Sequence, residues 1–352
     1  MDFNLKIGVS LGGSIGDVLN TSALLVGLKR QFPQSDITYF LFAGADILRG
    51  NKTINTIKTI PANGFNQAVE KLRVQFDIFV EIRYPCKYFF SEKALKIPEV
   101  LEFKKHWEVN YKDYYEPLWE EFLSNIDRLD KFCDKNHMTV YDLRRDSSCL
   151  DYTDDDQFVH LSPEDYKASE SLEGMRVVCV NNTGVFGTMT KSWSTDGWAK
   201  IIAHLKSKGM YVVQLGRKTE SDLPGVNERF YGTIHETAAV IKRAKFNIFI
   251  EGGLAHISKA LGKRSIVLFG PTPVHVFGYP ENINLKGTEC SPCWHNSKAT
   301  FDWNRYCVKT GLMATTETPA CMRSLDAKKV IEAVDKFLVE FGILSKKRMV
   351  HA

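Results

Sequence analysis

The sequence of 352 residues has no long hydrophobic run, no strong charge of either sign and no internal repeat. No stretch approaches the ~18 uninterrupted apolar residues of a transmembrane helix, and the opening MDFNLKIGVSL lacks the basic region of a signal peptide. A formal net charge of +4 is too small to indicate a nucleic-acid-binding protein. Eight cysteines without a secretion signal favour reduced thiols or metal ligands in a cytoplasmic protein.

Two nucleotide-binding signatures are also missing. The glycines of LGGSIGD (Gly12, Gly13 and Gly16) do not spell G-x-G-x-x-G, and no Gly-Lys-Ser/Thr P-loop occurs. No acidic residue ends the following strand ITYFLF, where a nicotinamide enzyme would bind its ribose. The sequence therefore disfavours a nicotinamide cofactor.

What is present is an alternation of strand-like and helix-like segments in both halves of the chain, with 44% hydrophobic residues overall. This alternation predicts parallel sheets with crossover helices, and the length predicts two domains. We expect an α/β protein with two doubly wound, Rossmann-like domains facing each other across a cleft. The predicted strands are 5–11, 36–42, 76–84, 176–182, 211–216, 245–250 and 265–270, and the predicted helices are 18–32, 194–209, 234–244, 254–262 and about 325–344.

The predicted boundaries are 1–155 for the first domain, 170–325 for the second, and 325–352 for a C-terminal helix and basic tail. We interpret the polar segment 151–171 as the linker, and its Asp-Asp-Asp run as solvated charge rather than a metal motif. Residues 85–150 are less regular, and we expect the C-terminal helix to return and pack on the first domain.

The stretch FIEGGLAHISKALGKRSIVLFGPT, residues 249–272, puts an acid and two glycines between a strand and a helix. Gly252 and Gly253 allow a ligand to approach the backbone, and the helix from Leu254 offers free N–H groups that suit a phosphate. Glu251 is placed to accept hydrogen bonds from hydroxyl groups, and His256 to orient the loop. The plain alternative is a tight strand–helix turn with a surface acid.

Two further turns carry candidate residues. Asp17, on the glycine-rich turn after the first strand, could act as a general base, or could complement the dipole of its helix. In NNTGVFGTMTKSW, hydroxyl groups and one ammonium group form a candidate diphosphate clamp: Thr183, Thr188, Thr190 and Lys191. Taken alone, this loop fits a solvated loop with an incidental lysine equally well.

Together these stretches resemble glycosyltransferase family 9, the bacterial heptosyltransferases of lipopolysaccharide core synthesis. The stretches that carry the resemblance are GGSIGDVLNTSALLVGLKRQFP, TKSWSTDGWAKII and EGGLAHISKALGKRSIVLFGPTPVHVFG. The resemblance implies a GT-B fold that binds the acceptor mainly in the first domain and a nucleotide-sugar donor in the second, with inversion at the anomeric carbon. It implies a cell-surface glycan as acceptor, and leaves open a peripheral contact with the cytoplasmic face of the inner membrane.

The resemblance also implies roles for single residues. Asp17 corresponds to the catalytic base, Lys191 to a lysine on the donor phosphates, and Glu251 to an aspartate that contacts the donor sugar. Gly216 joins the donor-binding set, and the ribose contact falls on His235 or Glu236. No cofactor is then needed for the chemistry.

The implied activity is transfer of a sugar, heptose, from a nucleoside-diphosphate donor, ADP-heptose, to a hydroxyl of lipopolysaccharide core. Two alternatives remain: a nucleotide-sugar epimerase or hydrolase of the same fold, and a non-catalytic nucleotide-sugar-binding protein. From its aromatic and lysine content, we expect segment 84–119 to shape the acceptor site by stacking.

Four of the eight cysteines occur within residues 290–321, spaced C-x2-C-x13-C-x13-C. Four thiolates can hold one tetrahedral zinc or iron ion, which would be structural because no coordination position stays open. Some relatives in the autotransporter-modifying branch of the family carry a four-cysteine iron site in a comparable region. Reduced thiols in a loop are an equally good interpretation of these four residues: Cys290, Cys293, Cys307 and Cys321.

Overall fold

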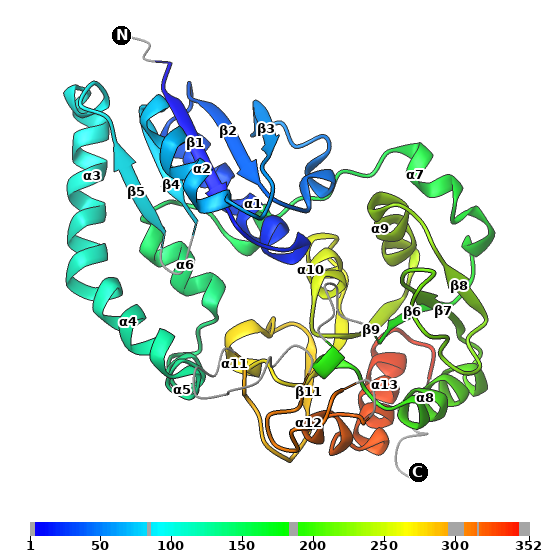
Figure 1. Cartoon of the computed structure of the whole chain (residues 1–352). Coiled ribbons are helices and arrows are strands. Elements are labelled where there is room, and N and C mark those ends of the chain that lie inside the picture. The colour runs from blue at the N-terminus through cyan, green and yellow to red at the C-terminus, as the bar shows by residue number, and fades with distance from the viewer. Residues whose placement is uncertain (1–3, 83–85, 183–188, 295–305, 315–316, 345–352) are drawn as a thin grey trace. The chain divides into compact units, whose positions relative to one another are not determined.

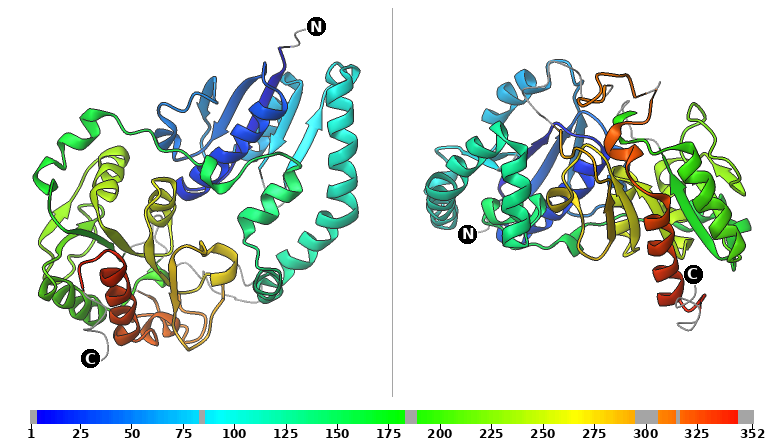
Figure 2. Two further views of the ribbon diagram at one scale, coloured as in Figure 1. Left: turned by 180° about the vertical axis from the view of Figure 1, so that it is seen from behind. Right: turned by 90° about the horizontal axis from the view of Figure 1, so that it is seen from below.

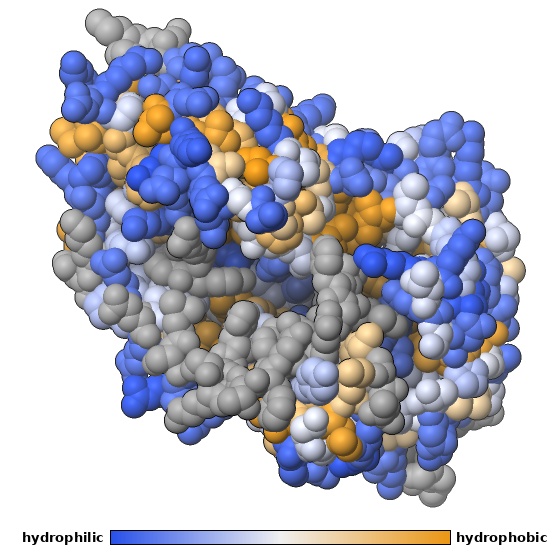
Figure 3. Space-filling view, in the orientation of Figure 1, coloured by the Kyte–Doolittle hydropathy of each residue, from blue (hydrophilic) through white to orange (hydrophobic). Residues whose placement is uncertain are grey.

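The computed structural model describes residues 4–82, 86–182, 189–294, 306–314 and 317–344. The chain divides into two compact units (Figure 1), the first formed by Met1–Arg128 and Phe132–His160, the second by Leu129–Lys131 and Leu161–Ala352. Hydrophilic residues cover much of the face shown in Figure 3, in line with a mean hydropathy of −0.22. None of the helices in the described part of the chain is long and apolar enough to cross a bilayer.

The first unit is built on a five-stranded sheet in the order β3-β2-β1-β4-β5. Its strands pair in parallel except for β5, which is antiparallel to β4. The predicted strands and the first helix are confirmed, whereas β3 and β5, with four residues each, were not predicted. In chain order the elements are β1 (Lys6–Leu11), α1 (Ile15–Gln31), β2 (Asp36–Leu41), β3 (Thr56–Thr59), α2 (Phe65–Leu72), β4 (Ile78–Glu81), β5 (Lys87–Phe90), α3 (Pro98–Asn110), α4 (Glu116–Ser124), α5 (Ile126–Asn136) and α6 (Val140–Ser148).

Both faces of this sheet are covered, and residues 7–11 of β1 are all buried although Gly8 and Ser10 alternate with its apolar side chains. On β2, neighbouring side chains point to opposite faces. Phe40 packs with Phe65 of α2 and Phe79 of β4 in one buried cluster. Tyr39 faces α1 instead, where its hydroxyl meets Thr21. The sheet therefore buries α2 on one face and α1 on the other.

Residues 85–150 are more regular than the sequence analysis suggested, because most of this segment is helical, from α3 to α6 (Figure 2). Its rings form a core of their own: Tyr88 lies edge-on to Phe103 and Trp107, with ring centroids 5.3 and 5.2 Å apart. All three side chains are buried. The expectation that the rings of this segment stack on an acceptor is wrong for these three, which pack on each other.

The acidic run in segment 151–171 also differs from the expectation. Asp154–Asp156 form a short 3-10 helix, and both carboxylate oxygens of Asp156 accept hydrogen bonds from Arg30 of α1, at 2.7 and 2.8 Å. Partial burial opposes ionisation, but the Arg30 guanidinium holds the pKa of the Asp156 carboxyl below its ordinary value. Asp156 therefore fastens this segment to α1 and is not simply solvated charge.

The second unit is built on a six-stranded parallel sheet in the order β11-β10-β9-β6-β7-β8. Gly209 and Gly262 follow α8 and α10 with φ of 75° and 67°, the left-handed conformation that glycine adopts without strain. The predicted strands and helices of this unit are confirmed. In chain order the elements are α7 (Pro163–Lys167), β6 (Val177–Asn181), α8 (Thr195–Ser207), β7 (Tyr211–Leu215), β8 (Glu228–Phe230), α9 (Ile234–Arg243), β9 (Phe246–Ile250), α10 (Gly253–Ala260), β10 (Ser265–Phe269), α11 (Val274–Phe277), β11 (Ile283–Lys286), α12 (Ala320–Arg323) and α13 (Ala327–Glu340).

The C-terminal helix α13 packs on the second unit, so the expectation that it returns to the first unit is wrong. Val334, Phe337 and Leu338 of α13 belong to the same buried cluster as Trp198 and Ile202 of α8. His204 of α8 also meets Asp335 of α13, with Nε2 and Oδ1 2.7 Å apart. The apolar stripe of α13 therefore completes the core of the second sheet. The basic tail lies outside the described residues.

Candidate functional site

The strand order of the second unit defines where a ligand can bind. The chain leaves β6 toward β7 on one side of the sheet and reaches β9 on the other side, so the strand order reverses between β6 and β9. In open α/β sheets, ligands bind outside the carboxyl ends of the strands at such a switch point. The segments that follow β6 and β9 contain Lys191 and Glu251, two of the predicted donor residues.

Lys191 and Glu251 form a buried ion pair in which the Lys191 ammonium group donates to Oε2 of Glu251. Thr272, from the turn after β10, donates to the same carboxylate oxygen at 2.8 Å. Burial alone would raise the pKa of the Glu251 carboxyl, but the charge and hydrogen bond of Lys191 hold it below its ordinary value. The segments after three neighbouring strands, β6, β9 and β10, therefore meet at one carboxylate.

The loop that carries Lys191 is closed by a pair of hydrogen bonds that the sequence analysis missed. The side chain of Asn182 donates to the carbonyl oxygen of Trp193 at 3.0 Å and accepts from its N–H at 2.7 Å. The Trp193 ring is buried and donates to the carbonyl oxygen of Leu325 at 3.1 Å. Asn182 and Trp193 thereby fix both ends of the loop and place Lys191 beside Glu251.

The helix after β9 presents a free N-terminus. α10 begins at Gly253, and its N-cap, Gly252, has no side chain to accept the first N–H groups. Apart from its chain neighbours, no atom of the residues that the structure describes lies within 4 Å of a Cβ atom placed on Gly252, so these residues leave open space there. Unpaired N–H groups and the positive end of the helix dipole can bind an anion there.

His256 lies in the same helix and is buried. Its Nδ1 lies 2.9 Å from the hydroxyl oxygen of Tyr279, which is also buried, and its charge contributes to lowering the pKa of Glu251. Tyr279 therefore holds the imidazole in place, and the orienting role of His256 stays a prediction.

The residues predicted to contact the ribose have structural partners. The carboxylate of Glu236 accepts from the N–H of Thr233 at 2.6 Å, closing a capping box at the start of α9, and His235 is buried. At the carboxyl end of β7, a Cβ atom on Gly216 would lie 2.3 Å from a carboxylate oxygen of Glu220. Glu220 is thus a third acid at this edge of the sheet, which the sequence analysis missed.

The structure describes one of the three threonines of the predicted clamp, Thr190. Thr190 is buried, and within the described part of the chain its hydroxyl oxygen has no hydrogen-bond partner. Thr190 lines a cavity of about 230 Å³ together with the four clustered cysteines. Thr183 and Thr188 lie outside the described residues.

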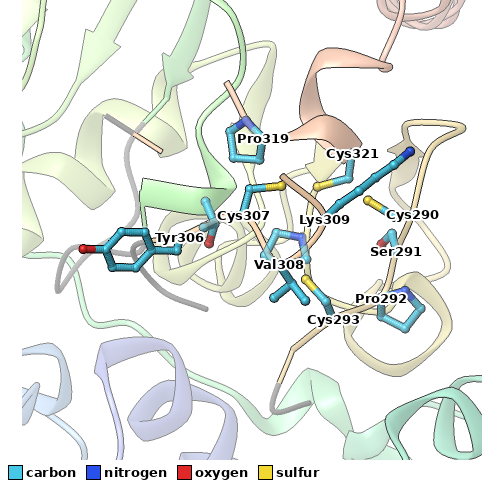
Figure 4. A pocket seen from close by; sticks show the side chains of 12 residues that line it. Cys290, Ser291, Pro292, Cys293, Tyr306, Cys307, Val308, Lys309, Pro319 and Cys321 are labelled. Atoms are coloured by element: carbon cyan, nitrogen blue, oxygen red, sulfur yellow. The ribbon is translucent and has the colours of Figure 1, made fainter. Parts of the chain in front are cut away.

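That cavity brings together cysteines that are distant in the sequence. Figure 4 shows Cys290, Cys293, Cys307 and Cys321 around it, and all four are free thiols. Burial and the neighbouring thiols raise the pKa of Cys293 to about 11 and that of Cys321 to about 12. Four soft donors in one cavity suit zinc or iron. However, no three metal-binding side chains in the described residues are arranged to hold an ion as they stand.

The first unit has a corresponding turn at its own switch point, between β1 and β4. Asp17 lies in the first turn of α1, where its Oδ2 accepts from the backbone N–H and the hydroxyl of Ser14, at 2.8 and 2.9 Å. A Cβ atom on Gly13 would lie 2.6 Å from Cβ of Asp17, so glycine is needed for this approach. Among the residues described in the structure, none donates a hydrogen bond to Oδ1 of Asp17.

Each unit is built on a sheet whose strands are parallel apart from β5, with polar side chains at its switch point, as in the GT-B fold that the resemblance implies. Residues 136–303 match the family model of glycosyltransferase family 9 (heptosyltransferase). This match agrees with the predicted resemblance to this family.

Two solved structures share the fold. The ADP-heptose lipopolysaccharide heptosyltransferase II of Escherichia coli is 14% identical, with a TM-score of 0.56, over 96% of this chain and 99% of that one. The iron-containing dodecameric glycosyltransferase TibC of enterotoxigenic Escherichia coli is 14% identical, with a TM-score of 0.59, over 97% of this chain and 78% of that one.

A relative in sequence is the autotransporter heptosyltransferase BAHTCr of Citrobacter rodentium, 28% identical over 124 residues. The aligned stretch is 32% of this chain and 30% of that relative.

We predict that Gly252→Ala weakens ADP binding without unfolding the protein. The added methyl group makes no close contact with the residues that the structure describes, but it occupies the space through which a diphosphate would approach the N-terminus of α10. Calorimetry should show that the dissociation constant for ADP rises about tenfold, because the methyl group crowds the bound diphosphate. Gly12→Ala, where a Cβ atom has ordinary contacts of 3.4 Å or more, is the control and should leave ADP affinity unchanged. Unchanged affinity in Gly252→Ala would place the diphosphate elsewhere.

We also predict that Lys191→Met lowers the free energy of unfolding of the second unit by ~3–5 kcal/mol at pH 7, because it leaves a buried carboxylate unpaired. The double variant Lys191→Met/Glu251→Gln should recover much of this loss in urea titrations. The lowered pKa of Glu251 means that the pair stabilises the fold above the pKa of an unfolded glutamate, and that this contribution is lost as the pH falls through the folded-state value. The difference in unfolding free energy between the wild type and Lys191→Met should therefore become smaller as the pH falls. A difference in unfolding free energy that does not change with pH would contradict an origin in the charge of Glu251.

Proposed function

We propose that this protein is an inverting heptosyltransferase that moves heptose from ADP-heptose to a hydroxyl group of a cell-surface glycan such as lipopolysaccharide core. The observation that carries the proposal is the Lys191–Glu251 pair beside the free N-terminus of α10, at the switch point of the second sheet. One ammonium group and unpaired N–H groups suit a diphosphate, and a neighbouring carboxylate suits sugar hydroxyls. The names of the solved relatives support ADP-heptose as the donor.

In this mechanism the bound donor separates the Lys191–Glu251 ion pair, and each of the two residues then contacts the donor. Lys191 turns from Glu251 to the diphosphate, which frees the Glu251 carboxylate to accept from hydroxyls of the sugar, while Thr272 keeps it oriented. The N–H groups of Gly253 and Leu254 contact the same diphosphate. As the bond to the anomeric carbon breaks, these groups stabilise the charge that develops on the leaving ADP. Because these groups stabilise the negative charge on the leaving ADP, the proposed chemistry requires no cofactor.

Asp17 serves as the base of the transfer. Its Oδ1 takes the proton from the acceptor hydroxyl as the hydroxyl oxygen attacks the anomeric carbon from the face opposite the diphosphate, which inverts the configuration. Ser14 holds the other carboxylate oxygen and so orients the base. The donor residues Gly216, His235, Glu236 and His256 complete the binding site in this proposal, and Glu220 is a further candidate for the ribose hydroxyls.

A second acceptor class is favoured by two observations. The curated relative is named as an autotransporter heptosyltransferase, and the solved relative TibC is described as iron-containing, which is compatible with metal binding by the four cysteines of the cavity. The alternative acceptor is therefore a serine or threonine hydroxyl of an autotransporter polypeptide. The donor chemistry and the role of Asp17 are the same for both acceptors.

The proposal is tested by incubating the protein with ADP-heptose, and with UDP- and GDP-sugars as controls, beside core lipopolysaccharide or an autotransporter passenger polypeptide. Mass spectrometry should detect one added heptosyl group on one of these acceptors, from ADP-heptose alone. Asp17→Asn should lower the transfer rate by at least about a hundredfold with ADP affinity little changed, as expected for loss of a general base. Equal turnover of the donor without any acceptor would favour the epimerase or hydrolase alternative. A fully active Asp17→Asn variant would remove Asp17 from its role.

We further propose that the four cysteines hold a structural zinc or iron ion, for which their sulfur atoms must draw together from the positions described. Metal analysis of protein purified without an affinity tag should give about one equivalent per chain. Cys290→Ser/Cys293→Ser should abolish it, whereas Cys149→Ser, a free thiol outside the cavity, should not. Folded, active protein with less than about a tenth of an equivalent would refute the metal site.

A further inference from the structure

The hydroxyl of Tyr39 is buried at the interface of β2 and α1 in the first unit. The Tyr39 side chain is fully buried, and its hydroxyl oxygen lies 2.6 Å from Oγ1 of Thr21, which is fully buried as well. A phenol hydroxyl with no partner would be costly there, so this contact is a strong constraint. It connects the centre of the sheet to the first turns of α1.

The direction of the hydrogen bonds follows from a count of protons. Oγ1 of Thr21 lies 2.8 Å from the carbonyl oxygen of Asp17 and 3.1 Å from that of Val18. Carbonyl oxygens only accept, so the single proton of Thr21 is directed at the helix backbone. The proton between the two hydroxyls must then come from Tyr39. The result is a directed relay from Tyr39 through Thr21 to the main chain of Asp17.

Asp17 is therefore held from two directions by separate groups. Ser14 holds one oxygen of its side chain, and the Tyr39–Thr21 relay holds its carbonyl group. A threonine that donates to the carbonyl four residues earlier is common in helices and tends to bend them. Here the threonine oxygen is itself fixed by a buried phenol, so the backbone at Asp17 is tied to β2.

We propose that Tyr39 and Thr21 are positioning residues for the base Asp17, acting through the main chain of the first turn of α1. The proposal rests on the proposed role of Asp17. Neither residue touches the substrate, and their removal affects the chemical step because a displaced base is no longer in line with the acceptor hydroxyl. Misplacement by as little as ~1 Å can cost about a hundredfold in rate.

The first test compares Tyr39→Phe with Tyr88→Phe. The hydroxyl of Tyr88 is buried in the same unit and donates to the carbonyl oxygen of Ser148 at 2.9 Å, so its loss removes an equivalent hydrogen bond away from Asp17. We expect kcat to fall about tenfold in Tyr39→Phe, with KM for ADP-heptose unchanged, and to stay near the wild-type value in Tyr88→Phe. An unchanged kcat in Tyr39→Phe, or an equal fall in Tyr88→Phe, would overturn the proposal.

The second test uses Thr21, in case Tyr39→Phe does not fold. Thr21→Val has the shape of threonine without the hydroxyl and should lose kcat as Tyr39→Phe does, whereas Thr21→Ser keeps the hydroxyl and should restore most of it. The double variant Tyr39→Phe/Thr21→Val should be no slower than either single variant, because both break one relay. Equal kcat in Thr21→Val and Thr21→Ser would contradict the relay.

Hydrogen exchange separates this proposal from the proposed function. The amides of the second turn of α1 from Thr21 onward, which donate to carbonyl oxygens of the first turn, should exchange faster in Tyr39→Phe and Thr21→Val than in the wild type, Thr21→Ser or Tyr88→Phe, with no substrate present. Faster exchange in a protein whose Asp17→Asn variant stays fully active would refute the role of Asp17 as base and leave the relay as a device that shapes the turn. Unchanged exchange together with unchanged kcat would refute the relay itself.

Discussion

The turns at the switch point of the second sheet are held together by one contact, the ion pair between Lys191 and Glu251. The two residues are 60 positions apart, and they meet because β6 and β9 are neighbours in the sheet although β7 and β8 separate them in sequence. Taking both charges out of water is costly, and the cost is tolerable only with good geometry and further hydrogen bonds. The clamp between Asn182 and Trp193 supplies the geometry, and Thr272 supplies the additional bond.

The segment that carries Thr272 is braced from the other side by the cysteine-rich segment. The hydroxyl of Ser291 donates to the carbonyl oxygen of Gly270 at 2.6 Å, and the N–H of Cys293 donates to that of Pro271 at 2.9 Å. The cavity lined by the four cysteines also reaches Pro271 and Thr190. An ion in this cavity would stiffen the backbone behind the ion pair, which is the structural role that four thiolate ligands predict.

The two units hold their key groups in different ways, in keeping with the proposed chemistry. Asp17 is fixed through its side chain by Ser14 and through its main chain by Thr21, so its geometry is set before any substrate arrives. Lys191 is instead held by Glu251, an anion, which it exchanges for the diphosphate in the proposed mechanism. A base benefits from rigid placement, whereas a residue that binds a leaving group must follow the charge as it moves.

The sequence by itself determined the strands and helices that are long and strongly patterned, and the turns with Asp17, Lys191 and Glu251 that follow them. These features depend on local spacing and on glycines that end helices, which one stretch of chain can reveal. Only the tertiary structure decided several other features. These are the short strands β3 and β5, the helices from α3 to α6, and the packing of α13 on the second sheet. The same holds for the pairing of Lys191 with Glu251, the Asn182–Trp193 clamp and the Tyr39–Thr21 relay. Each of these joins residues that are distant in sequence, and no local pattern records which surfaces the strand order will bring together.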